Sequence, residues 1–331
     1  MQRVSEMPGD PSVRHGILDG PAVTDELAIP GLDASRPVHS PLRYPGGKSR
    51  LGPWMAWTMR ENGLIGGVFS EAYCGGAGAA IYLLSNNYVS RIEINDLDPA
   101  IAAFWRSAVL RSREFIARIE RIDVTLEERE RQREILRRPE RHSDLDLGFA
   151  AWFLNRVNRS GIIRGGPIGG TAGESRYDID VRFNRLELIG RFRRLGELSD
   201  RIGIHERDAL DFLDNEVPRF GGNQLAFLDP PYFHKSKQLY RNRYDRWDHE
   251  AVARAAGELD VLWIMTYDDC AEIAGLYEGM RQLTFSAVSY AGTTRSSRTE
   301  LMIYGNLVLS CRPVARKSIR PYPAGYPSGW Q

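Results

Sequence analysis

The strongest candidate for chemistry is the run Asp229-Pro230-Pro231-Tyr232, which directly follows the apolar stretch Gln224–Leu228. Proline has no N–H, so two consecutive prolines end a strand and leave nearby carbonyl oxygens free to accept hydrogen bonds. A carboxylate and a free carbonyl suit an NH2 donor, and the tyrosine ring suits a planar base. Ligands bind beyond the carboxyl ends of strands in open α/β sheets. We therefore expect a binding or catalytic site here rather than a rigid turn with a capping aspartate.

Two further runs could hold a ligand at the same edge of such a sheet. The glycine-rich run 71–78 (EAYCGGAG) would let a ligand approach the backbone next to a helix N-terminus. Asp96 follows at roughly the 20-residue spacing at which an acid commonly holds ribose hydroxyls. The dinucleotide fingerprint G-x-G-x-x-G fails because Ile81 stands at its last position, which counts against a dehydrogenase. The run 43–48 (RYPGGK) places Lys48 after two glycines but is too short for a P-loop.

Two other runs have a functional and a structural interpretation of similar weight. Asp208 and Phe212 could bond and stack a second base, or they could be a helix N-cap with a core phenylalanine. The run 155–161 (NRVNRSG), continuing to Arg164, carries side chains that read phosphates and base edges, or it is a solvated basic loop.

Strand-like and helix-like stretches alternate along the chain, which indicates a parallel α/β sheet. The last two strands are separated by a short loop without a helix, so we expect them to pair antiparallel. The charged stretch 120–140 is expected to be a helix with a solvated face, and 150–157 an apolar helix. Strands are expected at 67–73, 91–95, 202–206, 224–228, 261–266, 282–288 and 300–309, and helices at 77–88, 99–119, 209–213, 249–259 and 270–277.

Composition excludes several classes of protein. The 331 residues suggest about two domains, or one with an insertion. The three cysteines are far apart and form no CxxC pair, so we expect a reducing, cytoplasmic compartment and no disulfide framework. The histidines show no ligand spacing, and we expect no metal. No apolar stretch approaches the ~18 residues of a membrane helix, and the N-terminus has no signal-peptide core.

Together, and in this order, the runs RYPGGK, EAYCGGAG, INDLDP, LNRVNRSG, RDALDF and DPPY resemble the Dam-like, D12-class N6-adenine-specific DNA methyltransferases, which use S-adenosylmethionine. The resemblance covers about residues 41–310. It implies an α/β fold: a Rossmann-like, mostly parallel methyltransferase sheet with an antiparallel last strand and an inserted, mainly helical target-recognition domain. The implied organisation is a disordered leader (1–40), a catalytic domain (41–110 and 200–311), the DNA-binding insertion (111–199) and a disordered tail (312–331).

The resemblance also implies roles for individual residues. Asp96 would hold the ribose hydroxyls of the cofactor, and Asp208 would accept from its adenine amine, with Phe212 packing nearby. The sequence after Gly161 does not match the hairpin that reads GATC in Dam enzymes, so the target site does not transfer. The full implied sets are, for the cofactor, Tyr44, Gly47, Lys48, Glu71, Tyr73, Gly75, Gly78, Asp96, Asp208 and Phe212; for the target base, Asp229, Pro230, Pro231 and Tyr232; and for DNA, Asn155, Arg156, Asn158, Arg159 and Arg164.

The expected activity is transfer of the methyl group of S-adenosylmethionine to the N6 amine of an adenine flipped out of a specific double-stranded DNA sequence. N4-cytosine methylation uses the same amine chemistry and remains an alternative, although Asp229 rather than a serine favours adenine. A DNA- or cofactor-binding protein without catalysis is the other alternative. The resemblance further implies a bacterial or phage-encoded monomer that acts on double-stranded DNA away from membranes, with a cognate restriction endonuclease as a candidate partner.

Overall fold

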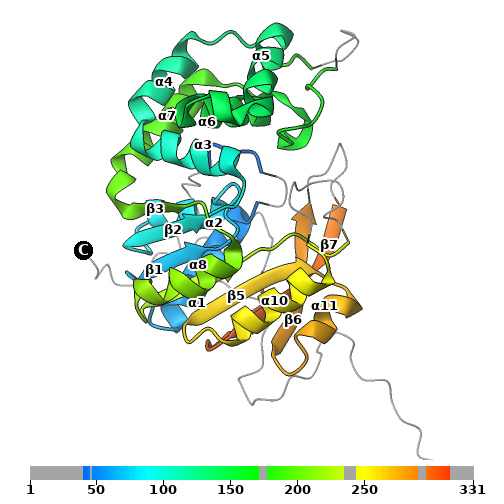
Figure 1. Ribbon diagram of the computed structural model, residues 1–331. Coiled ribbons are helices and arrows are strands. Elements are labelled where there is room, and N and C mark those ends of the chain that lie inside the picture. The colour runs from blue at the N-terminus through cyan, green and yellow to red at the C-terminus, as the bar shows by residue number, and fades with distance from the viewer. Residues whose placement is uncertain (1–39, 45–46, 171–176, 235–243, 290–295, 314–331) are drawn as a thin grey trace, which may run out of the picture.

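The computed structural model describes residues 40–44, 47–170, 177–234, 244–289 and 296–313 (Figure 1). The expected leader (1–40) and tail (312–331) lie almost wholly outside these residues. Within the described ranges, no helix combines the length and the apolar composition that crossing a membrane requires.

A seven-stranded sheet in the order β3-β2-β1-β4-β5-β7-β6 forms the centre of the molecule. β1, β2, β3, β4 and β5 pair in parallel, whereas β7 runs antiparallel to both β5 and β6. The expected parallel sheet and the antiparallel pairing of the last two strands are therefore confirmed. The bounds are β1 (Val68–Glu71), β2 (Arg91–Asn95), β3 (Ile202–His205), β4 (Gln224–Leu228), β5 (Leu262–Asp268), β6 (Arg281–Ser289) and β7 (Ser296–Gly305).

Both faces of the sheet are buried, and alternate residues of one strand enter different apolar clusters, as the two-residue repeat of a strand requires. In β4, Leu225 and Phe227 belong to one cluster, and Ala226 and Leu228 belong to the other. Helices α1 (Gly52–Glu61), α2 (Gly78–Ser85) and α3 (Pro99–Leu110) cover the first face, and α8 (Ala209–Asn215), α10 (Arg246–Gly257) and α11 (Ala271–Leu276) cover the second (Figure 1).

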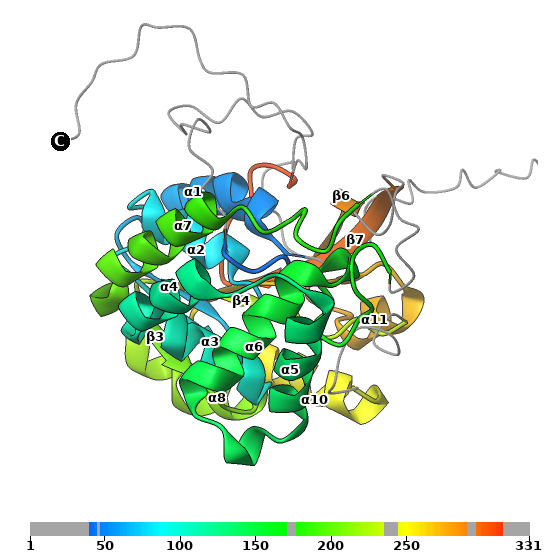
Figure 2. The same ribbon diagram turned by 90° about the horizontal axis from the view of Figure 1, so that it is seen from above.

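Four more helices form a group beyond the β3 edge, which we call the helical group (Figures 1 and 2). They are α4 (Ser112–Arg121), α5 (Leu126–Arg137), α6 (Asp144–Val157) and α7 (Arg185–Glu197). Its centre is aromatic, with the Phe115 and Phe192 ring centroids 4.5 Å apart and the Trp152 ring 5.5 Å from each. These rings belong to the same apolar cluster as the first face of the sheet, so the helical group is packed continuously onto that face.

Two expectations about the helices need correction. The single helix expected over 99–119 is two helices, because the backbone leaves the helical region at Arg111 (φ −124°, ψ 34°). The sequence has no proline or glycine at this position that would predict the break. The charged stretch is not only a solvated face. In α5 the side chain of Arg129 is buried and donates to Asn158 Oδ1 (2.7 Å) and Gly165 O (2.7 Å), so this helix anchors the loop that follows α6.

Candidate active site

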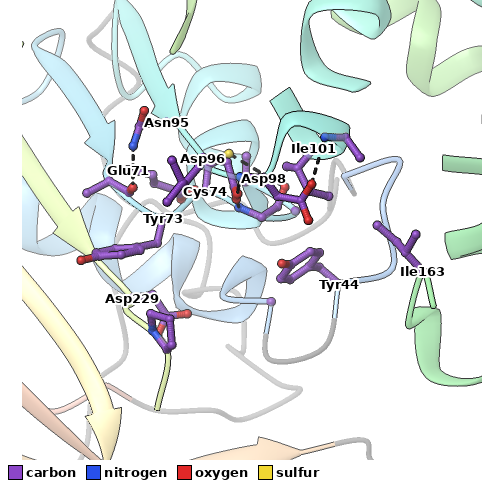
Figure 3. Close-up of a pocket in the computed structure, with 18 of the residues that line it drawn as sticks. Tyr44, Glu71, Tyr73, Cys74, Asn95, Asp96, Asp98, Ile101, Ile163 and Asp229 are labelled. Atoms are coloured by element: carbon purple, nitrogen blue, oxygen red, sulfur yellow. Dashed lines mark hydrogen bonds between the residues drawn. The ribbon is translucent and has the colours of Figure 1, made fainter. Parts of the chain in front are cut away.

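A pocket of about 340 Å³ opens at the carboxyl ends of β1, β2 and β4. Its walls come from the glycine-rich turn, from the start of α3 and from the segment before α1, and Leu147 and Ile163 reach it from the helical group. Figure 3 shows Tyr44, Tyr73, Asp96 and Asp229 around this common space, with Ile163 on the side of the helical group. Parallel strands direct their carboxyl ends to one edge, which is why residues from distant parts of the sequence meet there.

Asp229 lies at the end of β4 and is held from two sides. The Thr266 hydroxyl, on β5, donates to Asp229 Oδ1 at 2.7 Å, and the Lys48 ammonium lies 3.0 Å from the same oxygen. Lys48 also donates to the Tyr232 hydroxyl (2.7 Å) and lies 3.5 Å from a carboxylate oxygen of Glu300 on β7. The Lys48, Asp229 and Glu300 side chains are 10%, 19% and 13% exposed, so this charge network is largely screened from water.

Burial and pairing act in opposite directions on this network. Burial would lower the pKa of Lys48, but the nearby carboxylates of Asp229 and Glu300 and the hydrogen bond with the Tyr232 hydroxyl outweigh it, so the pKa lies well above its usual value and the amine is an ammonium. Burial raises the pKa of Asp229, and Glu300 raises it further, while Lys48 and the Thr266 hydrogen bond lower it. Lys48 is therefore the main group that favours the ionised form of Asp229.

The turn after β1 is built for close approach to its backbone. Gly75 has φ +43°, and a Cβ there would lie 2.5 Å from the Tyr44 ring. A Cβ on Gly78, the first residue of α2, would lie 2.9 Å from the Ser49 nitrogen. Glycine is therefore required where the segment around Tyr44 packs onto the turn. Beside this turn, burial raises the pKa of Glu71 to about 8, and its carboxyl accepts from the Ala80 N–H (3.1 Å).

Asp96 and its neighbour Asn95 join the loops at this edge. Asp96 accepts from the N–H groups of Gly75 (2.8 Å) and Asp98 (2.9 Å), and burial raises its pKa to about 6 despite these bonds. Asn95 is buried and donates to Ala72 O (3.0 Å) and Arg207 O (3.1 Å), which connects the loops that follow β1 and β3. These hydrogen bonds join the loops that form this wall of the pocket.

The comparison with protein families agrees with this geometry. The D12 class N6 adenine-specific DNA methyltransferase family matches residues 44–290, a span that contains the motifs described above except Arg43, the first residue of RYPGGK. The chain belongs to this family. It is therefore an adenine-specific DNA methyltransferase, and methyltransferases of this family use S-adenosylmethionine.

Two solved structures of other methyltransferases resemble this chain at low sequence identity. A putative RNA methyltransferase, PH1948 from Pyrococcus horikoshii, is 9% identical, with 78% of this chain and 83% of that chain covered and a TM-score of 0.37. The rRNA methyltransferase aviRa from Streptomyces viridochromogenes is 16% identical, with 84% and 94% covered and a TM-score of 0.35. The search of curated proteins gave no match.

The pocket of the methyltransferase fits S-adenosylmethionine. The cofactor carries a sulfonium and an ammonium, and Glu71 offers a buried carboxyl whose ionised form such positive charge would favour. Gly75, Gly76 and Gly78 line the pocket, so the backbone of the glycine turn is accessible to a ligand there. Most of the residues expected at the cofactor line this pocket, namely Tyr44, Gly47, Lys48, Glu71, Tyr73, Gly75, Gly78 and Asp96.

The structure places Asp208 and Phe212 differently. The Asp208 carboxylate is exposed and caps α8 by accepting from the Leu210 N–H (2.9 Å). Phe212 is fully buried in the second apolar cluster, with the His205 ring 5.1 Å away. Both residues therefore do what the structural alternative expected, and neither lines the pocket. A contact between Asp208 and the cofactor's adenine stays a prediction.

The residues expected at DNA separate into buried and exposed sets. Asn155 and Asn158 are fully buried, and their amides bond the backbone of the segments around them. Arg156 is also buried, whereas Arg159 and Arg164 are exposed, and Arg164 borders the pocket. An asparagine amide can satisfy either a base edge or a peptide group, so residue type alone does not separate these roles.

Among the target-base residues, Asp229 and Pro231 line the pocket, whereas the buried Pro230 and the half-buried Tyr232 do not. Residue roles missed by sequence reasoning are those of Thr266 and Glu300, which hold Asp229 and Lys48. Both lie in strand-like stretches near the end of the chain, and no spacing in the sequence connects them with Asp229 and Lys48. Tyr244 also lines the pocket, with its hydroxyl 3.1 Å from that of Tyr73.

One group of side chains capable of holding a metal occurs in the described ranges, formed by His234, Cys270 and Glu272. His234 and Glu272 are exposed and 3.8 Å apart, and the pKa of the buried Cys270 thiol is raised by burial. None of these three residues lines the pocket, and the absence of a functional metal stays a prediction.

Proposed function

We propose that this enzyme transfers the methyl group of S-adenosylmethionine to the N6 amine of an adenine that has left the stack of a double-stranded DNA site. The observation that supports the proposal is the Asp229 carboxylate, which lines the pocket at the end of β4 and is held by Lys48 and Thr266. The bound cofactor would supply an electrophilic methyl group on a sulfonium.

The amine of adenine is a weak nucleophile because its lone pair is delocalised into the ring. In the proposed reaction the Asp229 carboxylate and the Pro230 carbonyl accept the two N–H groups, which draws the nitrogen toward sp3 and directs its lone pair at the methyl carbon. The N–C bond forms as the S–C bond breaks, the electron pair of that bond stays on sulfur, and one amine proton leaves through Asp229. Positioning and fixed charges supply most of the rate enhancement.

The proposal requires the base to leave the duplex, because the amine is not accessible inside the stack. Unstacking costs a few kcal/mol. Contact with the Tyr232 ring returns about 1–3 kcal/mol of this if the base stacks there. In this account the helical group contributes the target recognition, and the exposed Arg159 and Arg164 contact DNA beside the pocket.

The substitution Asp229→Ala tests the proposal. Glu300 remains near Lys48, so the buried ammonium keeps a partner and the fold should persist. We expect methyl transfer in a single turnover to fall by at least about 10²–10³-fold, the usual effect of losing a preorganised polar group. Duplex binding should stay within a few-fold, and Asp260→Ala at an exposed site provides the matched control. Unchanged transfer by Asp229→Ala would refute the assignment.

A further inference from the structure

An arginine in the interior of the protein forms no salt bridge with any described residue. Arg156, in the last turn of α6, is 6% exposed, and its Nε is buried without an acceptor. Within the described part of the chain, none of the salt bridges involves its guanidinium. Buried arginines are normally paired, since an uncompensated buried charge destabilises a fold.

The surroundings of Arg156 are fixed by its neighbour in the sequence. The Asn155 side chain accepts from the Arg43 N–H (2.8 Å) and donates to the carbonyls of Arg43 (3.1 Å) and Gly161 (2.7 Å). Arg43 in turn donates from Nη1 to the Arg156 carbonyl at 3.4 Å. Gly161 has φ +75°, and a Cβ there would lie 1.9 Å from the Arg43 carbonyl oxygen. The segment before α1 is thus clamped against the end of α6.

Further arginines gather at this junction. The charges of Arg191, Arg43 and Arg182 all act on Arg156, and Glu187 is the acid that opposes them. Burial is the largest cause that lowers the pKa of Arg156, to about 9, and these positive neighbours lower it further. Arg191 also donates to Ser40 O (2.8 Å) and pairs with Glu187. We call these four residues the arginine cluster: Arg43, Arg156, Arg182 and Arg191. The cluster carries more positive than negative charge, and its buried member Arg156 lies at a junction that hydrogen bonds hold in place.

We propose that this arginine cluster binds a backbone phosphate of the DNA next to the target base. The inference rests on the proposed function, because the phosphate belongs to the DNA that enters the pocket. Tyr44, which adjoins Arg43 in the chain, lines the pocket, as do the residues from Gly161 to Arg164. Gly161, which lines the pocket, packs against the Arg43 carbonyl, so the junction of Arg43 and Arg156 adjoins the pocket. A guanidinium fork matches phosphate oxygens in a two-point arrangement.

This assignment separates Arg156 from residues that read sequence. A phosphate contact fixes the position of the sugar–phosphate backbone while the base rotates, and it carries no sequence information. The partly buried position suits an oxyanion held at one place more than a base edge that changes with sequence. Asn155 is then a positioning residue, which holds Arg43 beside Arg156 and touches no DNA itself.

The test measures duplex binding against salt concentration for the full chain and Arg156→Met. Each phosphate contact contributes about 0.9 to the slope of log K against log salt, so losing one makes the slope less negative by about that amount. The deficit of the variant should therefore shrink about 3.5-fold between 50 and 200 mM salt. It should be equal for duplexes of unrelated sequence, and Arg254→Met, at an exposed site on α10, should keep the original slope.

The free protein provides a second readout. Replacing an unpaired buried charge by an apolar side chain of similar length should leave the thermal midpoint without DNA at or above that of the wild type. An unchanged salt slope overturns the proposal. Should Arg156→Met not fold, the exposed Arg182→Gln decides by the same slope measurement. A wild type that binds with the expected slopes but does not methylate adenine would refute the proposed function instead.

Discussion

The substitution Lys48→Met tests how the catalytic carboxylate is kept ionised. Lys48 lies 3.0 Å from Asp229 and is the largest influence that lowers the pKa of this buried carboxyl. Methionine keeps the length and the apolar stem of lysine and removes the ammonium. The sequence alone assigned Lys48 to the cofactor, whereas the structure connects it to Asp229, Tyr232 and Glu300.

The size of the effect follows from the geometry. An opposite charge within about 4–6 Å lowers a carboxyl pKa by 1–3 units, so its removal should raise the pKa of Asp229 by a similar amount. That shift corresponds to about 1.4–4 kcal/mol. Because the folded-state pKa then lies further above the unfolded value of 3.8, the variant loses stability as pH rises through that window and keeps it below.

The assay is single-turnover methyl transfer measured from pH 6 to 9, together with the Kd for S-adenosylmethionine. At neutral pH the rate of Lys48→Met should fall by at most about 10- to 10³-fold, which is the loss of ionised Asp229 that a pKa rise of about 1–3 units allows, and it should recover as pH rises and Asp229 ionises. Lys48→Arg should retain most of the rate. Removing the second carboxylate in Lys48→Met/Glu300→Gln should restore part of it, because Glu300 also raises the pKa of Asp229.

A different pattern would refute this reasoning. If Lys48→Met weakened cofactor binding and left the pH profile of the transfer rate unchanged, Lys48 would act on the cofactor and not through Asp229.

Three other predictions concern the pocket and its support. Gly75→Ala should weaken cofactor binding, measured by calorimetry, because the new Cβ would lie 2.5 Å from the Tyr44 ring. Gly63 also has a positive φ but no neighbour within 4 Å, so Gly63→Ala is the control that measures the backbone cost alone, about 1–2 kcal/mol. The wild type should become less stable as pH rises from 4.5 to about 8, because the buried Glu71 carboxyl ionises, and Glu71→Gln should not show this loss. Urea unfolding at pH 5 and pH 9 measures the difference, and the same pH dependence in both proteins would contradict a buried Glu71 with a raised pKa. Asn155→Ala should cost about 2–4 kcal/mol in chemical unfolding, because three hydrogen bonds to buried backbone groups are lost, and a smaller cost would contradict the clamp.

The sheet was predictable because its strands are short apolar runs with clear ends. The expected ranges of β2 and β4 match the observed bounds, and the DPPY run begins directly after β4 as its prolines require. By contrast, β7 begins at Ser296 and not at residue 300, since polar residues can extend an antiparallel strand without an apolar signal. The break between α3 and α4 at Arg111 likewise had no signal in the residue types.

The active site was predictable in its parts and not in its connections. Residues adjacent to strand ends, such as Asp96 and Asp229, could be placed at one edge from topology alone. The contact between Lys48 and Glu300 joins positions far apart in the chain, and spacing carries no information about it. The pattern of asparagines and arginines around Asn155 indicates polar recognition, but only packing shows that the amides are used by the protein's own backbone.

The most direct test of the central claim is transfer of tritium from labelled S-adenosylmethionine to unmethylated genomic DNA, followed by nucleoside analysis. The account predicts that the label is recovered in N6-methyladenine, and sequencing of the same DNA would then identify the recognised site. Label in N4-methylcytosine would leave the amine chemistry intact and contradict the substrate. No label in DNA, from protein that binds both S-adenosylmethionine and duplex, would contradict the assignment of Asp229 as the catalytic carboxylate.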